Sequence, residues 1–219
     1  MAIRVDVISD VVCPWCFIGK RKLERALRLY AGRCPEAPAP VVAWHPFQLN
    51  PELPPGGIDR DEYLRRKFGG RADEIYARVA AAGAAVDIAF AFGRLVRQPN
   101  TLAAHSLIAL AADAGRQDPV VEALFSAYFI DGRDLTSEEA LSEVVIGAGL
   151  DPGAVAGCLA SENARERMRS EDLQSRELGV EGVPFFIFNR RYAVSGAQDP
   201  EVLFGALQKA GSEPPGSPD

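Results

Sequence analysis

Cys13 and Cys16 are the two residues whose type and spacing point most directly to chemistry. A chain of this length with four cysteines holds such a Cys-x-x-Cys pair by accident in roughly one case in twenty. Residues three apart at the start of a helix lie on one face, with their Cα atoms within reach of a disulfide. The unpaired N–H groups and the dipole of that helix favour negative charge. We therefore predict that Cys13 is the thiolate nucleophile and that Cys16 resolves the mixed disulfide.

The other cysteines and the histidines stand singly, as Cys34, His45, His105 and Cys158. Zinc sites take four ligands, usually from two closely spaced sets, and the sequence offers no second pair. We therefore predict no metal site and a structural role for His45. Cys34 and Cys158 are expected to be inert packing thiols, and a third redox cysteine is the alternative.

Composition narrows the classes of protein that fit these 219 residues. Apolar residues make up 47% and charged residues 25%, the balance of an ordinary globular protein. The net charge of −6 gives no basic surplus for nucleic acid. The longest nearly apolar stretch, Val79 to Phe92, is broken by Asp87 and is too short for a bilayer. The N-terminus lacks the pattern of a secretory signal, so we expect a cytoplasmic protein without membrane or nucleic-acid partners.

The hydrophobic pattern predicts the elements that must position the cysteine pair. Residues 3–9 alternate as a strand does, and a helix is expected over 16–31 with Pro14 at its first turn. A second strand is expected over 41–48, where Pro46 indicates an edge or a strand end. Near the C-terminus we expect a hairpin of 185–188 and 192–194, a helix over 200–210 and a disordered tail over 212–219.

The middle of the chain is expected to be helical apart from one extended piece, residues 86–92, which alternates with the period of a strand. Asp118-Pro119 and Asp151-Pro152 are typical of a capping residue followed by a proline at the first helical position. Thr136 and Glu139 have the spacing of a capping box. Further helices are expected near 63–68, 72–83, 99–114 and 162–177. This order of elements describes one small α/β unit with a helical insertion.

Several motifs together resemble a known family. The segment Asp10-x-x-Cys13-Pro14-Trp15-Cys16-Phe17-x-Gly19-Lys20 after the first strand resembles the DsbA-type thioredoxin-fold oxidoreductases, in particular their cytoplasmic FrnE-like branch. Gly182-Val183-Pro184 before the hairpin is similar to the cis-proline loop of that fold. The resemblance covers nearly all of residues 3–210. It also includes Asn100-Thr101, Ala104-His105 and Ser195-Gly196-Ala197-Gln198.

The resemblance implies an α/β, thioredoxin-like fold with a large all-helical insertion domain, as in DsbA. Residues 1–55 and 162–211 would form the discontinuous thioredoxin-like domain, and residues 56–161 the insertion. It further implies a thiol–disulfide oxidoreductase or isomerase that acts on protein or peptide substrates, as a monomer or a homodimer. The redox-active disulfide would need no cofactor, and glutathione is a candidate co-substrate.

The resemblance also assigns roles around the pair. Pro184 would be cis and would place the Val183 backbone beside Cys13, where an extended substrate can pair with it. Pro14 and Trp15 occupy the dipeptide that tunes the reduction potential, and both are expected to contact the substrate, with plain packing as the alternative for Trp15. DsbA carries Pro-His there, so a pair less oxidising than that of DsbA is expected.

Three polar residues have two open interpretations each. Asp10 would assist proton transfer near Cys16 or cap its loop, as aspartate commonly does. His105 and Asn100 would face the active-site groove or serve in packing. The run from Gly19 to Lys22 is interpreted as a solvated helix face.

Two other functions remain as alternatives. The chain resembles glutathione-dependent enzymes with the same insertion, namely 2-hydroxychromene-2-carboxylate isomerase and the kappa-class glutathione transferases. These usually carry serine where Cys13 stands and lack the second cysteine, so the intact pair favours redox chemistry. The second alternative is a non-catalytic peptide-binding or chaperone module.

Overall fold

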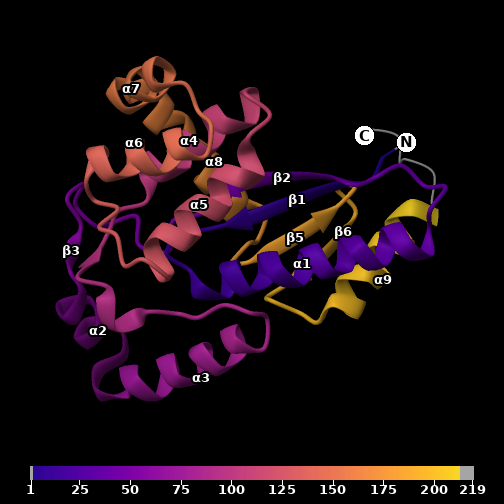
Figure 1. The fold of residues 1–219 in the computed structure, drawn as a ribbon, viewed down its shortest axis with the longest axis horizontal. Coiled ribbons are helices and arrows are strands. Elements are labelled where there is room, and N and C mark those ends of the chain that lie inside the picture. The colour runs from indigo at the N-terminus through magenta and orange to yellow at the C-terminus, as the bar shows by residue number, and fades with distance from the viewer. Residues whose placement is uncertain (1, 213–219) are drawn as a thin grey trace.

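A computed structural model describes residues 2–212, in which a four-stranded mixed sheet has the order β2-β1-β5-β6 (Figure 1). The inner strand β1 (Arg4–Ser9) pairs in parallel with β2 (Val41–Pro46) and antiparallel with β5 (Phe185–Phe188). The edge strand β6 (Tyr192–Ser195) completes the predicted hairpin. Every residue of β1 after Arg4 is buried, which matches its place inside the sheet.

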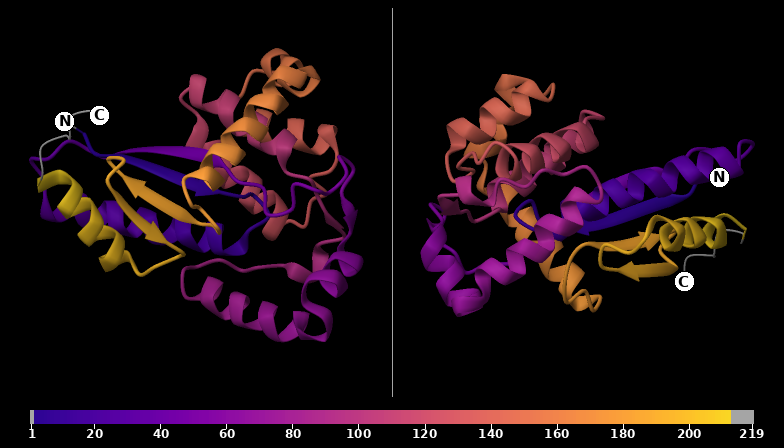
Figure 2. Two further views of the ribbon diagram at one scale, coloured as in Figure 1. Left: turned by 180° about the vertical axis from the view of Figure 1, so that it is seen from behind. Right: turned by 60° about the horizontal axis from the view of Figure 1, so that its bottom comes forward.

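The helix that follows β1 carries the cysteine pair. This helix, α1 (Pro14–Arg33), packs against the last helix, α9 (Pro200–Ser212). Figure 2 shows α8 (Glu162–Glu177) on the opposite side of the sheet from α1. Phe17 of α1 is fully buried and stacks on Phe125, with ring centroids 5.0 Å apart. Because Phe125 belongs to the insertion, the reactive helix and the insertion share one core.

The insertion is helical apart from one short antiparallel ladder, β3 (Ile58–Asp59) with β4 (Arg97–Gln98). Its helices lie in two groups, α2–α3 and α4–α7 (Figure 1). Together with the sheet, this arrangement confirms the predicted thioredoxin-like fold with a helical insertion. The helices are α2 (Arg60–Phe68), α3 (Ala72–Ala84), α4 (Leu102–Asp113), α5 (Gln117–Phe129), α6 (Glu138–Gly147) and α7 (Pro152–Ala160), with 3-10 turns at Gly69–Arg71 and Phe92–Arg94.

The extended segment predicted over residues 86–92 is wrong. Helix α3 gives way to an irregular loop, in which Asp87 has a φ of 65°. Phe90 and Phe92 of this loop stack at 4.7 Å, and Phe90 meets Phe129 edge to face at 5.3 Å. The alternation in the sequence therefore reflects aromatic side chains that turn inward from a loop, not a pleated strand.

Two of the predicted helix starts are displaced, by two residues in α5 and by one residue in α6. Helix α5 begins at Gln117 rather than after Asp118, and α6 is capped by Ser137, whose hydroxyl accepts from the Ala140 N–H. Thr136, the residue predicted to cap this helix, lies one position earlier, and its N–H donates to the Asp134 side chain. Asp151 caps α7 as predicted.

The C-terminal end of the described chain is helical. Helix α9 extends to Ser212, two residues beyond the predicted end at Ala210. The predicted disordered tail falls, apart from Ser212, outside the described residues. Among residues 2–212, none of the helices has the length and apolar character needed to cross a membrane.

Candidate active site

The first turn of α1 is built on the cysteine pair. Cys13 is the residue that precedes the helix, in extended conformation, and its carbonyl accepts the Cys16 N–H at 3.0 Å. Pro14 occupies the first turn, where its missing N–H costs nothing. Both cysteines are free thiols; Cys13 is 4% exposed and Cys16 is fully buried. Cys13 therefore lies at the start of α1 and keeps a small exposed area, whereas Cys16 lies inside the first turn and has none.

The loop that contains Pro184 lies against Cys13. The Cys13 Sγ donates to the Val183 carbonyl at 3.5 Å, and the Val183–Pro184 peptide bond is cis. The Pro184 carbonyl accepts the Gly196 N–H at 2.8 Å, which ties this loop to the end of β6. Cys13 and Val183, which lie 170 positions apart in the sequence, are therefore in contact in the fold.

Gly19 provides the space that Pro184 occupies. A Cβ atom at Gly19 would lie 2.8 Å from the Pro184 Cγ and 3.2 Å from the Phe186 Cζ. The first distance is shorter than real Cβ contacts, so only glycine allows the proline ring to pack on α1. The sequence analysis included Gly19 in the motif that resembles the family, but it assigned no structural role to this residue.

The environment of Cys16 differs from that of Cys13. Burial raises the pKa of the Cys16 thiol well above its usual range, and neighbouring Cys13 raises it further. Hydrogen bonds from the Asp10 backbone and the Ser9 side chain act in the opposite direction and are outweighed. Cys16 is therefore held as a protonated thiol in the reduced protein.

Asp10 and His105 form a buried pair behind the thiols. Asp10 is fully buried, and its Oδ2 accepts the Leu49 N–H at 2.8 Å. Its Oδ1 lies 3.5 Å from the Nε2 of His105, which is 3% exposed. Within residues 2–212 neither of these two atoms has a hydrogen-bond partner. His105 thus faces Asp10 in the interior.

Trp15 and Asn100 are placed differently from these residues. Trp15 is 42% exposed beside the half-buried Pro14, so its ring is available at the rim of the site. Asn100 donates to the Leu53 carbonyl at 2.8 Å and accepts from Gln48 and from the Leu102 N–H, both at 3.0 Å. Its amide holds the start of α4 and also lines a cavity of about 770 Å³.

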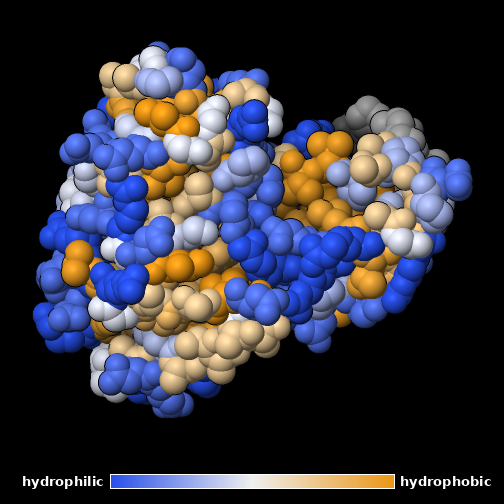
Figure 3. All heavy atoms as spheres, viewed as in Figure 1, coloured by the Kyte–Doolittle hydropathy of each residue, from blue (hydrophilic) through white to orange (hydrophobic). Residues whose placement is uncertain are grey.

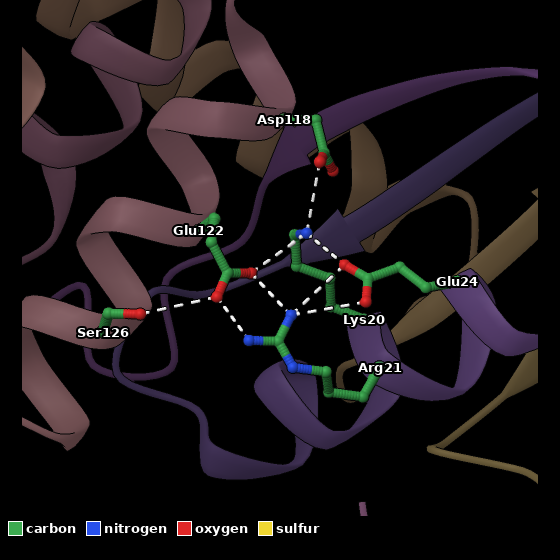
Figure 4. Close-up of polar contacts among 6 residues, drawn as sticks. All are labelled: Lys20, Arg21, Glu24, Asp118, Glu122 and Ser126. Atoms are coloured by element: carbon green, nitrogen blue, oxygen red, sulfur yellow. Dashed lines mark hydrogen bonds and ion pairs between the residues drawn. The ribbon is translucent and has the colours of Figure 1, made fainter. Parts of the chain in front are cut away.

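A network of charges joins α1 to α5 (Figure 4). Lys20, one turn after Cys16, is 3% exposed and bonds to Glu24, to Asp118 at 3.2 Å and to Glu122 at 3.1 Å. Arg21 pairs with Glu122 through both of its terminal nitrogens. Figure 3 shows a hydrophilic band along α1. The solvated face predicted for residues 19–22 is therefore wrong for its first half, because Gly19 and Lys20 are buried.

These contacts set the charge states of the network. Burial lowers the pKa of Lys20, but the bond to Glu24 and the charges of Asp118 and Glu122 raise it above its usual range. Burial raises the pKa of Glu122, but bonds from Arg21 and Lys20 outweigh it and hold the pKa below its usual range. Both groups are therefore charged across the neutral range.

Replacing Glu122 with glutamine is expected to lower the free energy of unfolding by about 1–2 kcal/mol at neutral pH, because charge-assisted bonds are lost. A depressed folded-state pKa stabilises the fold above the ordinary glutamate value of about 4.3 and less as the pH falls through the folded value. The difference between parent and Glu122→Gln in urea unfolding should therefore shrink in acid. Glu143→Gln removes an exposed partner of Arg133 and is the control. A difference independent of pH would contradict this assignment.

A buried arginine lies at the start of α2. Arg60 is 5% exposed and bonds to Gln98 and Tyr76, with its guanidinium over the Tyr63 ring at 5.2 Å. Burial raises the pKa of Tyr76, and the charge of Cys13 contributes to the shift. Among the described residues no carboxylate pairs with Arg60. Arg60 is therefore a buried cation without a carboxylate partner in the described part of the chain, and the sequence analysis did not identify it.

The remaining cysteines and histidine lie apart from this arrangement. Cys34 follows the last turn of α1, and Cys158 is a half-buried residue of α7 whose pKa is raised by burial. His45 bonds to Asp6 at 2.8 Å. Within residues 2–212, no group of three or more His, Cys, Asp or Glu side chains is arranged to hold a metal ion.

Comparison with known proteins gives relatives over almost the whole chain. A solved structure of a probable DsbA oxidoreductase from Streptomyces coelicolor has a TM-score of 0.86 and 32% identity, covering 97% of this chain and 91% of that one. The fold is also that of a 2-hydroxychromene-2-carboxylate isomerase, with a TM-score of 0.69, 15% identity and coverage of 94% and 95%.

The cytosolic disulfide reductase DsbM from Pseudomonas aeruginosa, solved with GSH, shares the fold as well. Its TM-score is 0.62 at 18% identity, covering 94% of this chain and 98% of that one. A family model described as the DsbA-like thioredoxin domain matches residues 4–208. The chain belongs to the DsbA-like thioredoxin domain family.

Proposed function

We propose that this protein is a thiol–disulfide oxidoreductase or isomerase that works through Cys13 and Cys16. The observation that carries the proposal is the placement of Cys13 at the start of α1, with its Sγ 3.5 Å from the Val183 carbonyl and with Cys16 behind it. A helix start favours the thiolate, which is the form that attacks a disulfide. The family supports this class of chemistry.

The two cysteines have different roles in the proposed cycle. Cys13, the less buried thiol, attacks a substrate disulfide and forms a mixed disulfide, which expels one substrate thiolate. Cys16 then attacks the Cys13 sulfur, forms the Cys13–Cys16 bond and releases the second substrate thiol. Its raised pKa keeps Cys16 protonated until this second step.

The Val183–Pro184 loop is proposed to hold the substrate beside Cys13. Among the described residues the Val183 N–H makes no backbone hydrogen bond, and its carbonyl accepts only the thiol. An extended peptide that pairs with these two groups would present its disulfide to Cys13. Exposed Trp15 offers apolar contact at the rim.

We infer a cytoplasmic setting and a reductive or isomerising direction. The dipeptide Pro14-Trp15 has no histidine, which supports a pair less oxidising than that of DsbA. Cytosolic glutathione and thioredoxin pools keep such pairs reduced. One relative in fold, DsbM, is described as a cytosolic disulfide reductase.

Glutathione is the proposed small-molecule co-substrate, and Arg60 supports it. This buried guanidinium lacks a carboxylate partner within residues 2–212 and bonds to Tyr76, whose pKa is raised in part by the charge of Cys13. Glutathione carries two carboxylates and a thiol, so its thiol could meet Cys13 while a carboxylate meets Arg60. The same observation favours the second candidate, a glutathione-dependent isomerase.

Trapping the intermediate tests the proposal. Cys16→Ser treated with oxidised glutathione is expected to accumulate one glutathione on Cys13, because nothing resolves the adduct; the parent protein should accumulate much less. Peptide mapping by mass spectrometry locates the adduct, and Cys13→Ser/Cys16→Ser is the control. An adduct found only on Cys34 or Cys158 would refute the proposal. Isomerase turnover that needs glutathione and survives Cys16→Ser would favour the second candidate.

A further inference from the structure

The Val183–Pro184 loop has few backbone bonds of its own. The Pro184 nitrogen carries no hydrogen, and among the described residues the Val183 N–H makes no backbone hydrogen bond. The Val183 carbonyl accepts only the Cys13 thiol. A loop that pairs with an extended substrate must leave such groups unpaired. Its position therefore depends on contacts made elsewhere in the loop.

The turn of residues 195–199, between β6 and α9, supplies one of these contacts. Its Gly196 N–H donates to the Pro184 carbonyl at 2.8 Å. Gly196 has a φ of 80°, which glycine adopts without strain, and its carbonyl accepts the Gln198 N–H at 2.9 Å. The Gln198 side chain donates to the Ser195 carbonyl at 3.0 Å. The turn is therefore bonded within itself, and where it lies determines where the Pro184 carbonyl lies.

Lys22 of α1 holds this turn from outside. Its Nζ donates to the Ala197 carbonyl at 2.9 Å and to the Asp199 Oδ1 at 3.2 Å. The Lys22 side chain is only 20% exposed, whereas that of Asp199 is 82% exposed. An ion pair with so exposed a partner contributes little, but a bond from an ammonium group to a shielded carbonyl is charge-assisted. The bond to Ala197 is therefore the main attachment.

Gly19 and Lys22 are three residues apart on α1, so they lie on the same face of this helix. Pro184 packs directly on Gly19, where a Cβ would lie 2.8 Å from the ring. Lys22 reaches the same loop indirectly, through the turn. Since α1 also begins next to Cys13, one helix positions the nucleophile and both supports of the loop.

We propose that Lys22 is a positioning residue, which fixes the 195–199 turn and through it the Val183 groups that pair with a substrate peptide. The inference rests on the proposed function, because it assigns a support to the proposed substrate loop. Without Lys22 the turn and the loop are free to shift relative to Cys13, which weakens the binding of an extended peptide. A disulfide that has no peptide backbone does not pair with Val183, so its reaction is independent of Lys22.

The test compares two disulfides on reduced protein that carries Cys34→Ser/Cys158→Ser. One is a short peptide with an internal disulfide, whose reduction is followed by alkylation and mass spectrometry. The other is 5,5′-dithiobis-(2-nitrobenzoate), whose first coloured thiolate reports attack by Cys13. Lys22→Met is expected to raise the half-saturating peptide concentration at least about fivefold and to change the limiting rate less. Attack on the small disulfide should stay within about twofold of the parent rate.

Two control variants separate this role from general stabilisation. Arg33→Met removes the pair between α1 and Glu201 of α9, with bonds of 3.0 and 3.1 Å, which has no link to Pro184. Asp199→Asn removes the ion pair of the turn but leaves the bond to the Ala197 carbonyl. Both variants should reduce the peptide with the half-saturating concentration of the parent protein.

An unchanged half-saturating concentration in Lys22→Met would overturn the proposal. So would an equal loss with both disulfides, or an equal loss in Arg33→Met, because either result indicates a general disturbance of α1. Lys22→Gln serves if Lys22→Met is poorly folded, and it should show the same selective loss. A parent protein that does not reduce the peptide would refute the proposed function itself, whereas normal peptide reduction by both the parent and Lys22→Met refutes this inference alone.

Discussion

Replacing Cys13 with serine is expected to reduce dithiol–disulfide turnover by at least about a thousandfold, because a neutral hydroxyl does not attack a disulfide. The fold should be unaffected, since Cys13 precedes α1 and serine is among the residues preferred at that position. The thermal midpoint of Cys13→Ser should therefore equal or exceed that of the parent protein. Reduction of a peptide disulfide by the pre-reduced protein measures the effect.

The chain provides matched controls for this substitution. Cys34→Ser and Cys158→Ser remove thiols that lie outside the first turn of α1, so turnover should stay within about twofold of the parent value. Substantial turnover in Cys13→Ser, or a loss in either control that equals its loss, would contradict the role given to Cys13.

Replacing Gly19 with alanine is expected to destabilise the protein by about 1–3 kcal/mol, the usual cost of overpacking a filled core. The added methyl would lie 2.8 Å from the Pro184 ring, which is rigid and must move. Movement of Pro184 shifts the Val183 carbonyl away from Cys13. Turnover should therefore fall at least about tenfold even at temperatures where Gly19→Ala is folded.

Gly32→Ala is the control for that substitution, because both glycines belong to α1. No atom lies within 4 Å of a Cβ at Gly32, and alanine favours a helix by up to about 1 kcal/mol. Gly32→Ala should keep full turnover and equal or raised stability. If Gly19→Ala also keeps full turnover and stability, the packing of the Pro184 ring on α1 does not require glycine at position 19.

The parts of the fold with local signals could be predicted from the sequence. Pro14 was predicted in the first turn of α1, which begins at Pro14 itself rather than at the predicted residue 16. The helix over 162–177 has the predicted bounds. The hairpin of β5 and β6 followed from two apolar runs separated by a short turn. In each case the information lies within a few residues of the element.

Features set by distant contacts could not be predicted. Lys20 belongs to a run of charges that is typical of a surface, and its burial depends on Asp118 and Glu122, about a hundred positions away. Residues 86–92 alternate like a strand, but their aromatic residues Phe90 and Phe92 pack on the Phe129 ring of α5. Helical and loop segments buried in this way carry no periodicity of their own.

The residues of the site likewise fall into those that the sequence could identify and those that only the structure brings together. The Cys-x-x-Cys spacing identified the two thiols, and the resemblance supplied Val183 and Pro184. The contact between Asp10 and His105 joins residues of separate elements, so the sequence left both with open interpretations. Nothing in the sequence marked Arg60, because a single arginine becomes informative only when burial without a carboxylate partner is seen.

The most direct test of the central claim is the redox equilibrium of the Cys13–Cys16 pair. The reduced protein would be incubated in graded mixtures of reduced and oxidised glutathione, and alkylation with mass spectrometry would count the remaining thiols. We expect one two-electron transition that converts Cys13 and Cys16 into a disulfide, at a potential between about −270 and −120 mV. Two thiols that stay reduced and unmodified in every mixture would contradict the claim that this pair performs disulfide exchange.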